Sequence, residues 1–156
     1  MILDALADLP AAAPRGRSLM GLDLGTRTIG LAVSDPDWRI ASPLDTIRRR
    51  RLAADLDALL AAMDSRQVGG LVLGWPVEMD GRPGKRCQAT RQFARDLLTH
   101  REVPIALWDE RLSTAAVERV MIADMDLSRR RRAGKVDQSA AAWILQGALD
   151  ALGRLP

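Results

Sequence analysis

Asp23 is the first of three acidic residues whose positions suggest chemistry. It lies in the middle of the apolar run Leu22–Asp23–Leu24, which is typical of a central strand. An unpaired carboxylate in such a strand costs several kcal/mol of desolvation, so a cation is expected beside it. One alternative is a hydrogen bond to the amides of the turn at Gly25 and Thr26. A bound metal ion is the more specific interpretation.

Glu110 and Asp137 are the other two acids. Glu110 comes directly after the apolar run Val103–Trp108, and open α/β sheets place ligands at the carboxyl ends of their strands. Its alternative role is a surface salt bridge with Arg27 or Arg111, which would contribute little to stability. Asp137 opens the last predicted helix, so its alternative role is that of an N-cap.

The three carboxylates together suit a divalent metal site. Mg²⁺ and Mn²⁺ prefer oxygen ligands, and Mg²⁺ usually keeps several waters and binds substrate phosphates. Two such ions, about 3.5 to 4 Å apart, can activate water and stabilise the leaving oxygen of a phosphodiester. We therefore predict that Asp23, Glu110 and Asp137 converge, bind Mg²⁺ or Mn²⁺ and catalyse phosphodiester hydrolysis in nucleic acid.

Other catalytic chemistries lack their residues. The single histidine, His100, lies at the predicted end of a helix, which disfavours zinc and any serine or cysteine triad. The sequence contains neither G-x-x-x-x-G-K-[ST] nor G-x-G-x-x-G, the two common phosphate-binding loops.

Arginine supplies nearly all of the positive charge, because only Lys85 and Lys135 are lysines among the 23 basic residues. Guanidinium groups bind phosphate oxygens well, although a charged run is commonly just a solvated helix end or loop. Two contiguous runs are candidates for phosphate contact, Arg48–Arg51 and Arg129–Arg132. The second run leads directly to Asp137 on a polar loop. The residues predicted to contact substrate there are Arg129, Arg130, Arg131, Arg132 and Lys135.

The pattern of apolar residues predicts three antiparallel strands followed by alternating strands and helices. Ser18–Asp35 is a hairpin with its turn at Gly25–Thr28, and a third strand falls within Trp38–Ile47. The remaining predicted elements are a helix from Leu52 to Ser65, a strand at Val68–Trp75, a loop at Val77–Lys85, a helix around Phe93–Leu98, a strand at Val103–Trp108, a helix after Ser113 and a last helix from Asp137. This order implies an α/β fold with a mixed five-stranded sheet and helices on both faces.

Length and composition indicate one folded domain. The chain has 156 residues, of which 47% are hydrophobic and 28% charged, values ordinary for a globular protein. We expect a flexible N-terminal extension at residues 1–17 and a single domain at residues 18–156. The sequence holds no apolar run long enough to span a membrane, and its one cysteine, Cys87, fits a reducing cytoplasm.

Four segments of the chain resemble the motif blocks of the YqgF family, also called RuvX. They read, in order, GLDLGTRTIGLAVSD, GWPVEMDG, DERLSTAAVE and KVDQSAAAWIL, and they span Gly21 to Leu145. The resemblance implies an RNase H-like fold and a metal-dependent nuclease acting on structured nucleic acid. The implied substrates are the 5′ end of the small-subunit ribosomal RNA precursor and the Holliday junction.

The resemblance also assigns residues to the site. It implies that Asp23, Glu110 and Asp137 are the catalytic acids, and that Thr26, Arg27 and Arg111 line the site. Two residues depart from the family pattern G-L-P-x-N-M-D-G. Trp75 replaces a leucine and Glu78 replaces an asparagine, which leaves the substrate preference open.

Two other functions stay open from the sequence. The chain could be a noncatalytic RNA-binding factor in ribosome assembly that keeps the fold and its basic residues. It could also be an actin-like nucleotide phosphotransferase, whose phosphate-binding hairpin reads D-x-G-T, although those enzymes need two lobes. The choice between RNA and DNA, and whether the chain forms a homodimer, are left open as well.

Overall fold

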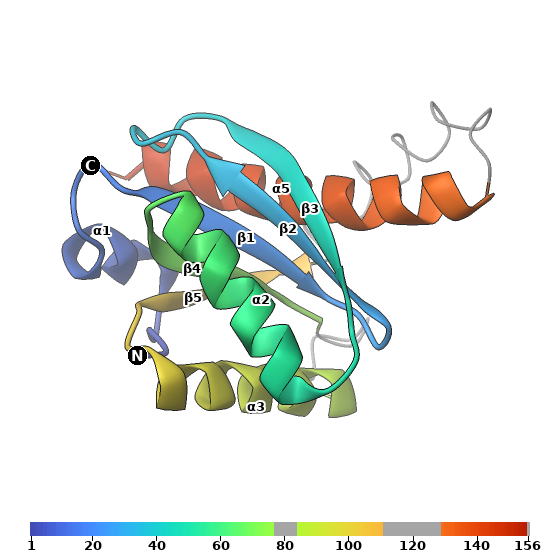
Figure 1. Ribbon diagram of the computed structural model, residues 1–156. Coiled ribbons are helices and arrows are strands. Elements are labelled where there is room, and N and C mark those ends of the chain that lie inside the picture. Colours follow the sequence, from blue (N-terminus) through green and yellow to red (C-terminus); the bar gives the residue numbers. More distant parts are fainter. Residues whose placement is uncertain (77–83, 111–128, 156) are drawn as a thin grey trace.

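A five-stranded mixed sheet forms the centre of the computed structural model, which describes residues 1–76, 84–110 and 129–155, with backbone alone at 129–139. The strand order is β3-β2-β1-β4-β5 (Figure 1). β1 pairs antiparallel with β2 and parallel with β4, β2 pairs antiparallel with β3, and β4 pairs parallel with β5. The strands are β1 (Ser18–Leu24), β2 (Thr28–Ser34), β3 (Ala41–Arg48), β4 (Val68–Trp75) and β5 (Ile105–Asp109). The predicted fold class is confirmed.

Helices cover both faces of this sheet, as Figure 1 shows. Alternate side chains of a strand point to opposite faces, so each strand contributes to two cores. Met20, Leu22 and Leu73 belong to the core under α2 (Leu52–Ser65) and α3 (Lys85–His100). Leu19, Val72 and Ala106 belong to the core under α5 (Arg129–Gly153).

Gly21 brings α5 close to β1. A Cβ at Gly21 would lie 2.7 Å from Cβ of Leu145 and 2.9 Å from the carbonyl oxygen of Ala141. Only a glycine allows this contact without movement of the helix backbone. The strand that carries Asp23 is therefore packed directly against the helix that carries Asp137.

The predicted flexible extension at residues 1–17 is corrected by the structure. This segment forms a 3-10 turn, η1 (Leu6–Asp8), and a short helix, α1 (Leu9–Ala12). Leu9 is fully buried in the core under α5, and the amide of Leu3 donates to the carbonyl of Ile105 at 2.8 Å. The Ala- and Pro-rich composition concealed a few apolar residues that cover a corner of the sheet.

The last helix also begins earlier than predicted. α5 starts at Arg129, so the arginine run is helical and Asp137 lies inside the helix. The alternative role of Asp137 as an N-cap is therefore excluded, and the prediction of a basic loop before it is wrong. Arginine, alanine and lysine are good helix formers, and propensity carried the helix through a segment with no apolar stripe. The loop at 77–83 and the helix predicted after Ser113 lie outside the described residues.

Most of the other predicted elements agree with the structure to within a few residues, but α3 begins at Lys85, well before Phe93. α2 and β4 have the predicted bounds. β3 begins at Ala41, because Trp38 adopts a positive φ of 59° and the carboxylate of Asp35 accepts the amides of Arg39 and Ile40 in a turn. Within the described ranges, no helix is long and apolar enough to cross a membrane.

Candidate active site

Asp23 lies near the carboxyl end of β1, on the face covered by α5. Its neighbour Leu22 points into the opposite core, so Asp23 turns toward α5. Asp23 pairs with Gly30 of β2 and is partly buried. The strand and the helix together hold its carboxylate in a position where water is only partly available.

Glu110 directly follows β5 and is held against Asp23. Burial and, next in size, the negative charge of Asp23 together raise the pKa of Glu110 to about 7. The protonated carboxyl of Glu110 is also stabilised by a hydrogen bond with Asp23, while the positive charge of Arg86 opposes the shift. The structure thus brings together two of the three predicted acids.

Asp137 lies in α5, four residues before Ala141, where that helix crosses β1. Its side chain is outside the described part of the structure. Among the described residues, no group of three or more acids, histidines or cysteines is arranged to hold a metal ion. The described side chains at this end of the sheet therefore supply two adjacent carboxylates, Asp23 and Glu110.

The turn between β1 and β2 carries Thr26 and Arg27, which are both exposed and follow shortly after Asp23 in the chain. The amide of Gly25 donates to the carbonyl of Thr28 at 2.9 Å and closes the turn. Arg49 fixes the turn from outside, because its guanidinium donates to the carbonyl of Gly25 at 2.8 Å and its amide donates to the carbonyl of Arg27 at 2.8 Å.

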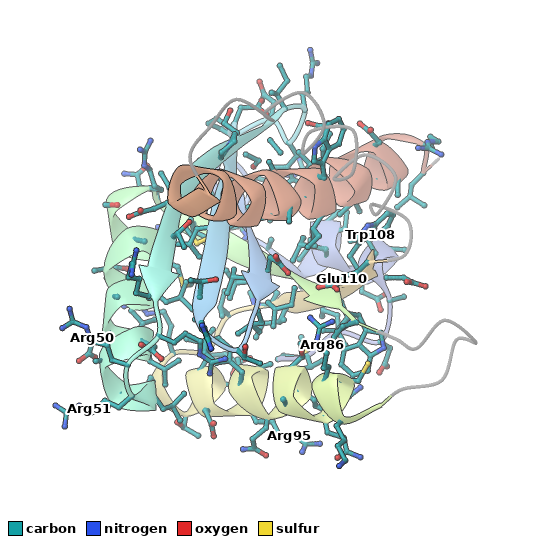
Figure 2. The ribbon with its side chains drawn as sticks, turned by 90° about the vertical axis from the view of Figure 1, so that its right-hand side faces the viewer. Arg50, Arg51, Arg86, Arg95, Trp108 and Glu110 are labelled. Carbon is teal, nitrogen blue, oxygen red and sulfur yellow. The ribbon has the colours of Figure 1, made fainter. Side chains whose placement is uncertain are left out.

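Arg49 is in turn held by two further contacts. Its Nε lies 3.7 Å from a carboxylate oxygen of the buried Asp55, and its guanidinium lies 5.8 Å from the centre of the Phe93 ring. These contacts make Arg49 a structural link between the hairpin and α3 rather than a free phosphate ligand. Arg50 and Arg51 are exposed and lie away from Glu110 in Figure 2.

Arg86, in the first turn of α3, is the site residue that the sequence analysis missed. Figure 2 shows Arg86 and Glu110 at the same end of the sheet. The positive charge of Arg86 lowers the pKa of Glu110 and so opposes part of the rise caused by burial and by Asp23. An isolated arginine carries little signal in a sequence. Its place after the loop that leaves β4 could have revealed it, since that loop starts at the carboxyl edge of the sheet.

Trp75, one of the two departures from the family pattern, is the last residue of β4 and lies at the carboxyl end of the strands. The guanidinium of Arg91 lies 5.3 Å from the centre of its ring. The side chains of the other predicted substrate contacts lie outside the described part of the structure. Arg111 lies outside the described residues, and Arg129–Arg132 and Lys135 are described only as backbone of α5.

The strand order, the helices on both faces and the acids at the carboxyl ends of β1 and β5 are the features of the RNase H-like fold. A solved structure of Thermus thermophilus RuvC in complex with a Holliday junction shares this fold with a TM-score of 0.53. That match covers 88% of this chain and 96% of RuvC at 15% sequence identity, so it establishes the fold alone.

The family follows from the sequence. Residues 17–151 match the family described as RuvX, Holliday junction resolvase, and the chain belongs to this family. A relative from Rhodospirillum rubrum is 56% identical over 154 residues, covering 99% of this chain and 96% of the relative. A relative from Phenylobacterium zucineum is 56% identical over 151 residues, covering 96% and 97%. Both carry the name "Putative pre-16S rRNA nuclease".

Proposed function

We propose that this protein is a divalent-metal-dependent nuclease that hydrolyses phosphodiester bonds in structured nucleic acid. The observation that supports the proposal is the contact between Asp23 and Glu110 at a half-buried position, where burial and then the charge of Asp23 raise the pKa of Glu110 to about 7. Two adjacent carboxylates at the carboxyl end of the sheet repel each other when both are ionised, and a bound divalent cation offsets this repulsion. Acids whose pKa values are shifted by burial and by a charged neighbour are candidates for function.

The residues at this edge suit Mg²⁺ or Mn²⁺. Asp23 and Glu110 supply carboxylate oxygens, which are the ligands that these hard cations prefer. Asp137 is the third proposed ligand, because helix residues four apart share a face and Ala141 packs on β1 at Gly21, which points to the same side of the strand as Asp23. When bound, the metal supplies a Lewis acid for the phosphate and an activated water.

The chain's own residues then have separate tasks. The proposed role of Arg86, Thr26 and Arg27 is to bind substrate phosphates beside the acids, since guanidinium and hydroxyl groups donate to phosphate oxygens. Glu110 must lose its proton before it can act as a ligand, and Arg86 favours that loss. The remaining proposed phosphate contacts are Arg111, Arg129, Arg130, Arg131, Arg132 and Lys135.

The favoured substrate is the small-subunit ribosomal RNA precursor. The relatives that are 56% identical carry the name of a nuclease for that RNA, whereas the RuvC match at 15% identity shows only the fold. A four-way DNA junction is the second candidate because the family description names it. Both reactions would take place in the cytoplasm.

The test incubates the purified protein with a precursor ribosomal RNA fragment and, in parallel, with a four-way DNA junction. Each reaction is run with Mn²⁺, with Mg²⁺ and with EDTA. We expect cleavage of the RNA only when a metal is present. Binding without cleavage in all three conditions would instead identify a noncatalytic RNA-binding factor.

Asp23→Asn is the diagnostic variant, because it removes charge from the site with little change in shape. It should abolish cleavage while RNA binding persists. Asp57→Asn makes the same chemical change on the exposed side of α2 and should cleave normally. Equal activity of the two variants would contradict the assignment.

A further inference from the structure

The two acids at the site come from strands that are not neighbours. Asp23 is in β1 and Glu110 follows β5, and β4 lies between these strands. Adjacent strands are about 4.8 Å apart, so the backbones that carry the two carboxyls are separated by roughly 10 Å. One of the side chains must therefore reach across β4.

Gly74 is the residue of β4 that lies in that path. Leu22 pairs with Leu73, so the next residue of β4, Gly74, lies beside Asp23. On its other side Gly74 pairs with Trp108 of β5, which comes shortly before Glu110 in the chain. Leu73 points into the core under α2 and α3, which places the missing side chain of Gly74 on the face of Asp23.

The space that a side chain of residue 74 would fill is occupied by Glu110. A Cβ at Gly74 would lie 2.5 Å from Oε1 and 3.0 Å from Cγ of Glu110, and 2.8 Å from Cδ1 of Ile144. Backbone conformation does not call for glycine here, because Gly16 is the one glycine with a positive φ among the described residues. Space is thus the reason for a glycine at this position.

We propose that Gly74 is a positioning residue for the acidic site: its missing side chain opens a passage over β4 through which Glu110 reaches Asp23. The inference rests on the proposed function for its catalytic meaning, but the passage itself is a property of the fold. It explains why the acid after β5 is a glutamate, since an aspartate is one methylene shorter.

The first experiment is a double-mutant cycle in EDTA, carried out in an Ile144→Val background that removes the Cδ1 contact. Gly74→Ala should lower the folding equilibrium constant about tenfold, the scale of overpacking by one methyl group. In the presence of Glu110→Ala, the same change should cost less than about twofold, because the occupying carboxylate is gone. Equal costs in both backgrounds would overturn the inference.

Gly70→Ala is the matched control. It lies in the same strand, and its Cβ would lie 2.9 Å from Cδ2 of Leu19, so it also overpacks a core. Its cost should be the same with Glu110 and with Glu110→Ala. A cost that depended on Glu110 would show that the cycle measures general loosening and would count against the passage.

The second experiment measures Mn²⁺ affinity by calorimetry or by electron paramagnetic resonance. Gly74→Ala should weaken binding about 10- to 100-fold, as changes to residues that orient metal ligands do, and Gly70→Ala should leave it within about twofold. Unchanged affinity in Gly74→Ala would overturn the positioning role. If the unmodified protein bound no Mn²⁺, the proposed function would fail, and the stability cycle would still decide whether the passage exists.

Discussion

The two ends of the parallel strands differ in how their acidic side chains are partnered. At the amino end, beside a cavity of about 680 Å³, Arg101 forms an ion pair with Asp64 and holds the pKa of that carboxyl below its ordinary value. At the carboxyl end, Asp23 faces Glu110, whose pKa is raised to about 7. The carboxylate of Asp64 has a cationic partner in the protein, whereas the two adjacent carboxyls of Asp23 and Glu110 can be neutralised further by a bound cation. The carboxyl end is therefore the better candidate site, although the cavity lies at the amino end.

The largest effect should come from removing an acid at the carboxyl end. Glu110→Gln should reduce cleavage by at least about 100-fold, because a neutral amide replaces a metal-binding carboxylate. Asp64→Asn at the amino end should change cleavage by less than about twofold. Single-turnover cleavage of the RNA fragment measures both. A similar loss in the two variants would abolish the distinction between the two ends.

The free energy of unfolding should depend on pH with opposite signs at the two ends of the strands. The folded-state pKa of Glu110 lies above its unfolded value of about 4.5, so the metal-free folded state retains a proton that the unfolded state releases. Its contribution to stability is fully present below about pH 4.5 and is lost as the pH rises through 7. Urea unfolding in EDTA at pH 5 and pH 8 measures this loss.

Glu110→Gln should remove that pH dependence, stabilising the protein on the order of tenfold in the folding equilibrium constant at pH 8 and little at pH 5. Asp64 has the opposite sign, because its lowered pKa gives stability that is lost only at acidic pH. A variant that is equally stabilised at both pH values would contradict the cause given for the shift.

An intermediate effect is expected where the hairpin turn is anchored. Arg49→Gln should lower the free energy of unfolding by about 1 to 3 kcal/mol, since a charged hydrogen bond to Gly25 is lost and Asp55 loses its ion pair. Urea unfolding measures this change. Arg48→Gln, at an exposed neighbouring position, should stay within about 0.5 kcal/mol. If Arg48→Gln cost as much as Arg49→Gln, the anchoring contacts would not be the cause.

The smallest effect on stability is expected from breaking the ion pair at the amino end of the strands. Arg101→Gln should change the free energy of unfolding by less than about 1 kcal/mol, because both members of its ion pair are exposed to solvent. The change should shrink further in high salt, which screens exposed pairs. A large, salt-independent loss in urea unfolding would mean that the amino end depends on this pair.

The sequence predicted the features that depend on local pattern. The hairpin, α2 and β4 follow from apolar periodicity and turn residues, and the contact between Asp23 and Glu110 follows from where two strands end. Gly74 was not predicted, because its role arises from a neighbour that lies far away in the sequence. Arg86 was missed for the same reason, since its importance comes from the acid that it faces rather than from its own surroundings.

The errors at the two ends of the chain both concern segments that lack an apolar stripe. At the N-terminus, Leu9 becomes buried because the sheet leaves a corner uncovered, which composition cannot show. At the last helix, a polar arginine segment continues a helix whose later turns are fixed by packing on β1. Tertiary contacts thus decided the structure at the N-terminus, whereas helix propensity extended α5 through the arginine segment.

The close packing of α5 on Gly21 limits how the chain length can vary. Leu145 and Ala141 fix the helix on β1, and four residues separate Ala141 from Asp137. One inserted or deleted residue between them would rotate position 137 by about 100° around the helix axis and shift it by about 1.5 Å. The same insertion beyond Leu149 would leave this register intact. Homologous chains that conserve the acids should therefore tolerate length changes after the packed turns of α5, but not between position 137 and the glycine contact.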